Sequence, residues 1–234
     1  MPTGVIFDLY ETLVTEYEPH WSPSVPSIAE RIGISEEAFS AGWKRVREAR
    51  MRGVINYPEA LQIISRFSGG PKVSSVLLDA LDNERRAEKA SPFLNIEKEI
   101  VDMLATLKER ENVRLCLMSN ASEEETWAWH NCVIKDYFDS VLFSYETGFM
   151  KPEIEIYNLA CRALNTQPQN TMFIGDGGAD ELRGAADAGL QPYWATWFID
   201  RWPKGIRLRF ESIAEKFPKI ALPRNVCGII QKIS

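Results

Sequence analysis

The 234-residue chain has no run of about 18 apolar residues, the length that a helix needs to cross a bilayer. Its N-terminus lacks the basic segment and apolar stretch of a secretory signal peptide. Basic residues are also fewer than acidic ones, 27 against 33. The formal net charge is −6, which argues against a general nucleic-acid surface because phosphate backbones are bound by lysine and arginine. We therefore expect a cytoplasmic protein without membrane or nucleic-acid partners.

Histidine and cysteine, the residues that build zinc sites and disulfides, are scarce. The chain has two histidines and four cysteines, and no two cysteines form a C-x-x-C pair. We expect four reduced thiols, with Cys116 buried as a small hydrophobic residue. His20 and His130 are expected to be structural. No low-complexity tract is present, and 45% of the residues are hydrophobic, so a chain of this length can bury a sizeable core.

The chain does contain a series of short apolar runs separated by helical patterns. The runs are residues 5–7, 113–118, 141–143, 172–174 and 193–197. Residues 92–110 have apolar side chains at helical spacing, and Ser91 with Pro92 predicts the start of that helix. Ser122 and Glu125 form a capping-box pattern, which predicts another helix start. Strands that alternate with helices predict a doubly wound parallel sheet of the α/β class, covered on both faces.

A long stretch near the N-terminus breaks this alternation. Strand signals nearly vanish there, and helical patterns cover residues 35–52 and 58–67. This predicts a helical domain of residues 15–90, inserted into an α/β core of residues 1–14 and 91–234. Arginine and lysine are frequent in the first half of the insertion. We treat them as a mainly solvated helix face and as weak candidates for substrate contact.

Polar residues stand after the apolar runs. They are Asp8, Ser119, Asn120, Lys151, Asp176 and Asp180. In a doubly wound sheet the ligand crevice lies at the carboxyl ends of the strands, so we expect these side chains to meet there. Trp194, Trp197 and Trp202 follow the last run and are expected to pack or to line a wall of the site. The tail, residues 206–234, carries no motif that predicts a role.

These residue types suit phosphoryl chemistry. Mg²⁺ prefers hard oxygen ligands and commonly takes one or two carboxylates, a role that Asp8 and Asp176 could share. Lys151 could offset charge on a transferring phosphoryl group, and Ser119 could donate a hydrogen bond to it. Asp8 could attack phosphorus as a carboxylate nucleophile. The residues alone thus indicate a magnesium-assisted reaction of a phosphorylated small molecule.

The order and spacing of these residues resemble the four motifs of the haloacid dehalogenase superfamily of hydrolases. The motifs in this chain are "FDLYETLV", "LCLMSNAS", "SYETGFMKPEIEIY" and "FIGDGGADELRGAADAG". They cover the core from residue 4 to about residue 197, and the third and fourth are individually specific. The resemblance implies a Rossmann-like core. The helical residues between the first two motifs resemble the cap domain that one branch of the superfamily inserts there.

Carried over residue by residue, the resemblance assigns roles to the motif residues. It implies that Asp8 is the nucleophile, that Ser119 is the phosphate-binding hydroxyl and that Lys151 balances charge. It also implies a Mg²⁺ site that includes Asp8, Asp176 and the backbone carbonyl of Tyr10. The side chain at position 10 is then not needed for metal binding.

Two neighbouring acids compete for one further position at the metal. Asp180, four residues after Asp176, fits the motif better and is expected to hold the metal or its water, with Glu181 as the second choice. Substrate contacts are expected from Tyr10, Thr12 and Asn120. The chain also has Glu11 where a glycine is often found, a position that varies enough in the superfamily to decide little.

Tyr10 departs from the pattern of the superfamily's phosphatases, which usually have a second aspartate two residues after the nucleophile. That aspartate acts as a general acid and then as a general base. A phenol with an unperturbed pKa near ~10 can donate a proton but is a poor base at neutral pH. Because such assistance typically contributes ~10² to 10⁴-fold, we expect slow hydrolysis of an aspartyl-phosphate at Asp8.

Three functions remain open from the sequence. The first is a Mg²⁺-dependent phosphatase that acts on a small phosphorylated metabolite. The second is a 2-haloacid dehalogenase-like hydrolase, because an Asp-x-Tyr start also occurs in those metal-free enzymes. They lack the metal-binding acid of the fourth motif, however, and this chain has Asp176, so we favour the phosphatase. The third is a weakly active or non-catalytic binding protein. The sequence predicts neither the substrate nor the oligomeric state.

Overall fold

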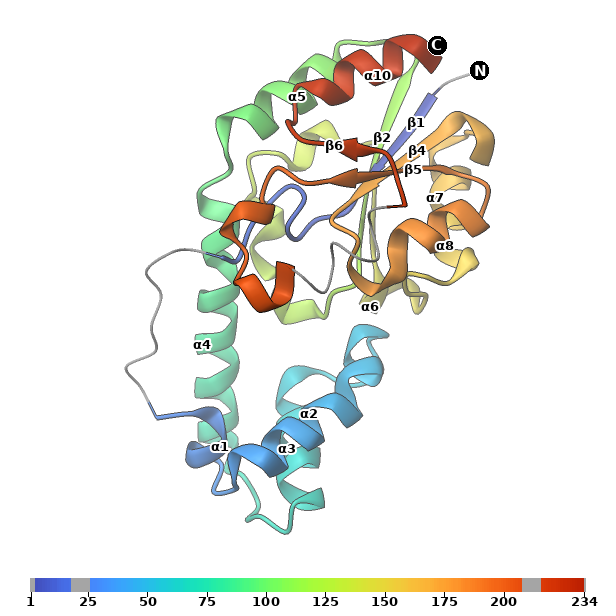
Figure 1. Ribbon diagram of the computed structural model, residues 1–234. Helices are drawn as coiled ribbons and strands as arrows, with labels where there is room; N and C mark the ends of the chain where they lie inside the picture. Colours follow the sequence, from blue (N-terminus) through green and yellow to red (C-terminus); the bar gives the residue numbers. More distant parts are fainter. Residues whose placement is uncertain (1–2, 18–25, 208–215, 234) are drawn as a thin grey trace.

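The computed structural model describes residues 3–17, 26–207 and 216–233, and His20 lies outside them. The described residues form a parallel sheet with the strand order β3-β2-β1-β4-β5-β6 (Figure 1). The strands are β1 (Thr3–Phe7), β2 (Val113–Ser119), β3 (Ser140–Phe143), β4 (Thr171–Gly175), β5 (Gln191–Ala195) and β6 (Lys219–Ile220). This sheet confirms the predicted doubly wound α/β core.

The central strands are apolar on both faces because helices cover both faces. All residues of β1 and β4 are buried, which is why these strands are continuous apolar runs in the sequence. One face packs on α5 (Lys98–Lys108) and α10 (Asn225–Ile233), and the other packs on α7 (Ile154–Leu164) and α8 (Glu181–Asp187). Alternate residues of β1 point to opposite faces, so Val5 and Phe7 join the first core and Ile6 joins the second.

The strand order places a ligand crevice beside β1. The chain runs outward from β1 through β2 to β3, and then crosses back to β4 on the other side of β1. Ligands in such sheets bind where the order reverses, at the carboxyl ends of the strands. Phe7 is in register with both Leu117 and Ile174, so β1, β2 and β4 end at about the same level.

Between β1 and β2 the described residues form helices and loops. The helices that precede α5 there are α1 (Ile28–Arg31), α2 (Glu36–Met51), α3 (Tyr57–Phe67) and α4 (Ser75–Leu94). They bury an apolar core of their own that includes Tyr57, Leu61 and Ile64. In Figure 1, α1–α3 lie below the sheet beside the lower half of α4, and α4 extends up to the α/β core. The predicted helices 35–52 and 58–67 correspond to α2 and α3.

The predicted helix start at Ser91 and Pro92 is wrong. Helix α4 continues through Pro92 to Leu94, and α5 begins only at Lys98. Proline lacks an amide hydrogen and usually disfavours a helix interior. Here Phe93 is buried, and its ring packs edge-on against Tyr10 and Trp129, with centroids 6.3 and 6.4 Å apart. This tertiary packing holds the last turn in place.

Short elements complete the fold. They are α6 (Ser144–Thr147) and the 3₁₀ helices η1 (Glu123–Glu125), η2 (Trp127–Asn131), η3 (Lys135–Tyr137), η4 (Pro168–Asn170), η5 (Gly178–Asp180) and η6 (Ile199–Arg201). The capping pair forms, since the amide of Ser122 donates to the Glu125 carboxylate (3.0 Å), but the helix it opens is the short η1. All four cysteines are free thiols. Among the described residues, no helix is long and apolar enough to cross a membrane.

Candidate active site

A buried ion pair stands at the end of β1. Asp8 is only 5% exposed, and its amide donates to the carbonyl of Ile174 (2.9 Å), which extends the β1–β4 pairing by one residue. The ammonium of Lys151, itself 4% exposed, donates to the Asp8 carboxylate and to the Glu181 carboxylate. The structure therefore places the expected nucleophile and the expected lysine in direct contact.

Three carboxylates gather around this lysine. Asp8, Asp176 and Glu181 each offer an oxygen atom within 4.8 Å of the others. Asp176 follows β4 and accepts a hydrogen bond from the amide of Gly178 (2.8 Å). Glu181 begins α8 and accepts one from the amide of Gly177 (3.0 Å). Hard carboxylate oxygens at this separation are a donor set that suits Mg²⁺.

The carboxylates carry more negative charge than Lys151 can balance. Burial, with the charge of Glu181, raises the pKa of Asp8 to about 7. Burial, with the charge of Asp8, raises the pKa of Asp176 to about 7. Burial also raises the pKa of Glu181 to about 7, although Lys151 opposes the shift. Burial alone would lower the pKa of Lys151, but Asp8 and Glu181 raise it above its ordinary value, so this lysine is charged.

The structure brings Glu181, rather than Asp180, into the carboxylate group. Gly177, Ala179 and Asp180 all have left-handed backbone angles, so the chain makes an extra turn before α8 begins. Asp180 is exposed, whereas Glu181 is 1% exposed. A side chain at Gly175 would overlap the Glu181 carboxylate, so glycine there leaves room for it. The prediction of Asp180 rests on its fit to the fourth motif, four residues after Asp176, and the adjacent glycines are the available sign of an irregular turn.

Asn120 acts on Lys151 through the backbone. Its side-chain amide donates to the carbonyl of Lys151, and its side-chain oxygen accepts from the amide of Lys151, both at 2.8 Å. The predicted substrate contact of Asn120 stays a prediction, and its amide pairs with the loop that carries the lysine. Ser119 is the last residue of β2 and is 2% exposed, which fits the predicted position at the crevice.

The Tyr10 hydroxyl already has a hydrogen-bond acceptor in the backbone. Its hydroxyl donates to the backbone carbonyl of Glu125 at 2.5 Å, and its ring packs on Phe93. Burial, followed by the charges of Glu125 and Glu16, raises the pKa of Tyr10 well above its ordinary value. The phenol is therefore neutral and already uses its proton. Nearby, the hydroxyl of Thr12 is fully buried and has no hydrogen-bond partner among the described residues.

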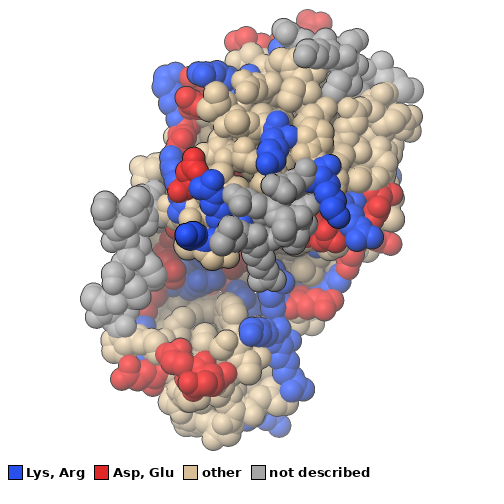
Figure 2. Space-filling model, in the orientation of Figure 1, with Lys and Arg blue, Asp and Glu red and all other residues tan. Residues whose placement is uncertain are grey.

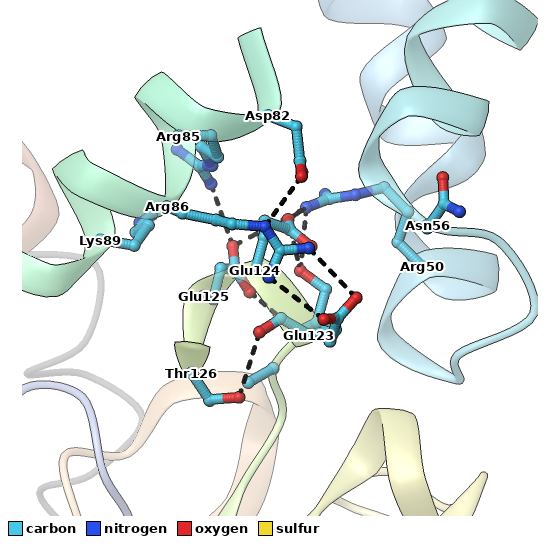
Figure 3. Close-up of polar contacts among 12 residues, drawn as sticks. Arg50, Asn56, Asp82, Arg85, Arg86, Lys89, Glu123, Glu124, Glu125 and Thr126 are labelled. Atoms are coloured by element: carbon cyan, nitrogen blue, oxygen red, sulfur yellow. Dashed lines mark hydrogen bonds and ion pairs between the residues drawn. The ribbon is translucent and has the colours of Figure 1, made fainter. Parts of the chain in front are cut away.

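The glutamates of η1 join the core to helices α2 and α4 (Figure 3). Arg50 of α2 is 1% exposed, pairs with Glu124, and stacks on the ring of Trp43 at 4.0 Å. The ion pairs from α4 are Arg85 with Glu125 at 3.0 Å and Arg86 with Glu123 at 3.1 Å. The prediction of a solvated basic face is thus wrong for Arg50. On the face shown in Figure 2, basic and acidic side chains are interspersed.

A cavity of about 750 Å³ adjoins residues 13–16. It is lined by residues 13–16, by the end of α4, and by Phe198 and Arg201 of the η6 region. None of the three carboxylates, nor Lys151, is among its lining residues, so this cavity is distinct from the carboxylate site.

Residues 2–189 match the family model of the haloacid dehalogenase-like hydrolases. The chain belongs to this hydrolase family. The match covers most of the chain and confirms the resemblance carried by the four motifs. It includes β1 to β4 and α8, and therefore all residues of the carboxylate site, and it ends shortly before β5.

Among curated relatives, both phosphatases and a dehalogenase are similar. Glyceraldehyde 3-phosphate phosphatase of Methanothermobacter thermautotrophicus is 29% identical over 158 residues, 66% of each chain. Phosphoserine phosphatase of Thermus thermophilus is 24% identical over 71% of this chain and 66% of its own length. The match thus spans just under two thirds of either phosphatase. (S)-2-haloacid dehalogenase of a Pseudomonas species is 27% identical over 82% of this chain and 81% of its own.

Solved structures share the fold. A 2-haloacid dehalogenase of Pseudomonas syringae superposes with a TM-score of 0.65 at 17% identity, with both chains fully covered. A HAD family enzyme of Bacteroides thetaiotaomicron, in complex with magnesium and inorganic phosphate, superposes with a TM-score of 0.53 at 23% identity. That match covers 83% of this chain and 94% of the other. At these identities the likeness shows the α/β fold.

Proposed function

We propose that this hydrolase is a Mg²⁺-dependent phosphatase that acts on a small phosphorylated metabolite, with Asp8 as the nucleophile that forms an aspartyl-phosphate. One observation carries the proposal: Asp176 stands beside Asp8 and Glu181, and the one ammonium that contacts this group among the described residues, Lys151, pairs with Asp8 and Glu181. A divalent cation would neutralise the excess negative charge, which is costly in a buried site.

The donor set fits Mg²⁺, and its members are Asp8, Asp176 and Glu181, with the backbone carbonyl of Tyr10 as the expected fourth protein ligand. When bound, Mg²⁺ would supply positive charge to the oxygens of the phosphoryl group. Glu181 takes the role first assigned to Asp180, because it is the acid that the turn after β4 brings to the site.

The residues of the chain supply the remaining tasks. Lys151 lowers the pKa of Asp8 against the effect of burial, which favours the ionised nucleophile, and it presents positive charge to the transferring group. Asn120 fixes the backbone of Lys151 and so sets the position of its ammonium. Ser119 is the hydroxyl that would bind phosphate oxygens. Thr12 is a further candidate, since its buried hydroxyl has no partner among the described residues.

Tyr10 makes the second half of the reaction slow. Hydrolysis of an aspartyl-phosphate needs a base that activates water, and the Tyr10 phenol is neutral and bonded to the Glu125 carbonyl. We therefore propose that the phosphorylated form at Asp8 accumulates during turnover. Helices α1–α4, which pack beside the α/β core (Figure 1), would serve as the cap over the crevice and select the substrate.

A dehalogenase-like reaction is the second candidate, and the same tyrosine favours it. Displacement of halide from carbon by Asp8 forms an ester without protonation of the leaving group. The hydrogen-bonded Tyr10 phenol therefore does not slow this first step. The similarity to the Pseudomonas dehalogenase also covers more of this chain than either phosphatase match does. This metal-free reaction gives Asp176 no role, which counts against it.

Product analysis separates the two candidates. The protein is incubated with a panel of phosphometabolites and an aryl phosphate, and separately with 2-chloropropionate, each with Mg²⁺ or with a chelator. We expect phosphate release that requires Mg²⁺ and is lost in Asp8→Asn. Chloride release that is insensitive to the chelator would instead establish the dehalogenase. Mg²⁺ binding without release of either product would point to the weakly active binding protein.

A further inference from the structure

We call residues 194–202 the indole segment. It contains three tryptophans, and each donates its indole N–H to one of the two loops that carry the site carboxylates. Trp194 donates to the backbone carbonyl of Asp176 (2.9 Å). Trp197 donates to the backbone carbonyl of Thr12 (2.8 Å), and Trp202 to the carboxylate of Glu11 (2.8 Å). Packing alone would not require three indoles to direct their only polar atom at these loops.

Glu11 explains why the loop after Asp8 needs such support. Its backbone is left-handed, with φ of 56°, a conformation that favours glycine. Its buried carboxylate accepts three hydrogen bonds, from the hydroxyl of Thr15 (2.8 Å), the amide of Glu16 (2.7 Å) and the indole of Trp202. A buried carboxylate with three donors is fixed in place, and it fixes the turn that follows the nucleophile.

The sheet order explains how one segment reaches both loops. β5 pairs with β4, and the chain leaves β5 at Ala195, at the same edge of the sheet as Asp176. Trp194 therefore meets the loop after β4, while Trp197 and Trp202 reach the loop after β1. The family match ends at residue 189, so the indole segment lies outside the region that the family model describes.

We propose that the indole segment is a positioning device, which sets the distance between Asp8 and Asp176 by holding both of their loops. The proposal rests on the proposed function for its catalytic meaning. Placement of reacting groups to a fraction of an ångström controls rate more than binding. Loss of one indole N–H should therefore lower kcat for the phosphorylated substrate and leave KM nearly unchanged.

The test uses Trp→Phe variants, which keep an aromatic ring and remove the donor. We expect Trp202→Phe and Trp197→Phe to lower kcat by on the order of tenfold with KM within about twofold, since a hydrogen bond to a charged or buried acceptor is typically worth that much. Trp194→Phe should also weaken Mg²⁺ binding. Glu11→Gln should lower kcat as Trp202→Phe does. The double variant Glu11→Gln with Trp202→Phe should lower kcat no more than either single substitution.

Trp129→Phe is the matched control, because this indole is as buried as Trp202 (5% against 6%) and packs in the aromatic core.

Amide hydrogen exchange gives a readout that needs no substrate. Trp197→Phe and Trp202→Phe should speed exchange in residues 9–16, and Trp194→Phe should speed it in residues 176–181. Unchanged kinetics together with unchanged exchange in folded variants would overturn the inference, as would equal rate losses in Trp129→Phe. If the unmodified protein releases no phosphate, the proposed function fails, and the exchange rates still decide whether the indoles hold the loops.

Discussion

The Tyr10 phenol stands where a proton-transferring group is expected beside the nucleophile, and it is bonded elsewhere. We expect Tyr10→Asp to speed phosphate release, because a carboxylate can act as both acid and base. The variant should also lose about 3 kcal/mol of unfolding free energy through lost aromatic burial. Tyr10→Phe is the control. It should cost about 1 kcal/mol, the worth of one hydrogen bond, and leave the rate within about twofold. Steady-state assays and urea unfolding measure both. A Tyr10→Phe rate far below the unmodified protein would contradict this account, because the phenol would then take part.

Gly175 is the residue whose missing side chain makes room for Glu181. We expect Gly175→Ala to displace the Glu181 carboxylate, and with it the Lys151 contact, and so to abolish most phosphatase activity. Gly228→Ala is the control, since a side chain there meets no atom within 4 Å. Activity and the rise in Tm caused by Mg²⁺ report the outcome. A Gly175→Ala protein that keeps both would show that Glu181 is not needed at the site.

The three carboxylates predict a pH dependence with a definite sign. Their pKa values are raised to about 7 in the folded protein, so between about pH 4 and pH 7 the folded state binds more protons than the unfolded chain. Without metal, stability should fall as the pH rises through this range. Mg²⁺ competes with those protons, so its effect on Tm should be larger at pH 8 than at pH 6. Thermal unfolding at both pH values tests this, and an equal or smaller effect at pH 8 would contradict it.

Helix α2 contacts the core through a buried charge. We expect Arg50→Ala to cost about 3 to 5 kcal/mol, because it leaves Glu124 buried without its partner. Arg47→Ala, an exposed position on the same helix, should change stability by less than about 0.5 kcal/mol. The double variant Arg50→Met with Glu124→Leu should recover most of the loss. Urea unfolding measures all three. Equal effects at Arg50 and Arg47 would mean that the pair does not join α2 to the core.

At the scale of elements, the central strands were predictable because burial on both faces forces them to be apolar runs. Residues 5–7 and 172–174 lie inside β1 and β4 for this reason. The boundary between α4 and α5 was not predictable from the sequence. Pro92 locally signals a helix start, but the burial of Phe93 determines where α4 ends. Strand β6 has only two residues and no periodic pattern to show it, and it forms by pairing with Trp194 and Ala195.

The candidate site was likewise predictable from the sequence only in part. Asp8, Ser119 and Asp176 could be assigned because each stands at the end of a strand, and the sheet alone brings strand ends together. The choice between Asp180 and Glu181 depended on the backbone of a two-glycine turn, which spacing does not reveal. The pairing of Asn120 with the Lys151 backbone, and of three indoles with the loops, joins residues far apart in sequence.

For the whole molecule, the fold gathers charge at one crevice, and the family membership is consistent with hydrolysis there. Phosphatases and dehalogenases are both similar to this chain, so the fold alone does not choose between them. The choice rests on Asp176 and the cation that its group of carboxylates would attract. The slow second step expected from Tyr10 then makes the covalent intermediate itself observable.

Mass spectrometry of the protein after incubation with an aryl phosphate or acetyl phosphate tests this account most directly. With Mg²⁺ present, we expect the peptide that contains Asp8 to gain the mass of one phosphoryl group, and we expect no gain with a chelator or in Asp8→Asn. An Asp8 peptide that gains no phosphoryl group in the wild-type protein with Mg²⁺ present, while chloride is released from 2-chloropropionate with the chelator present, would contradict it.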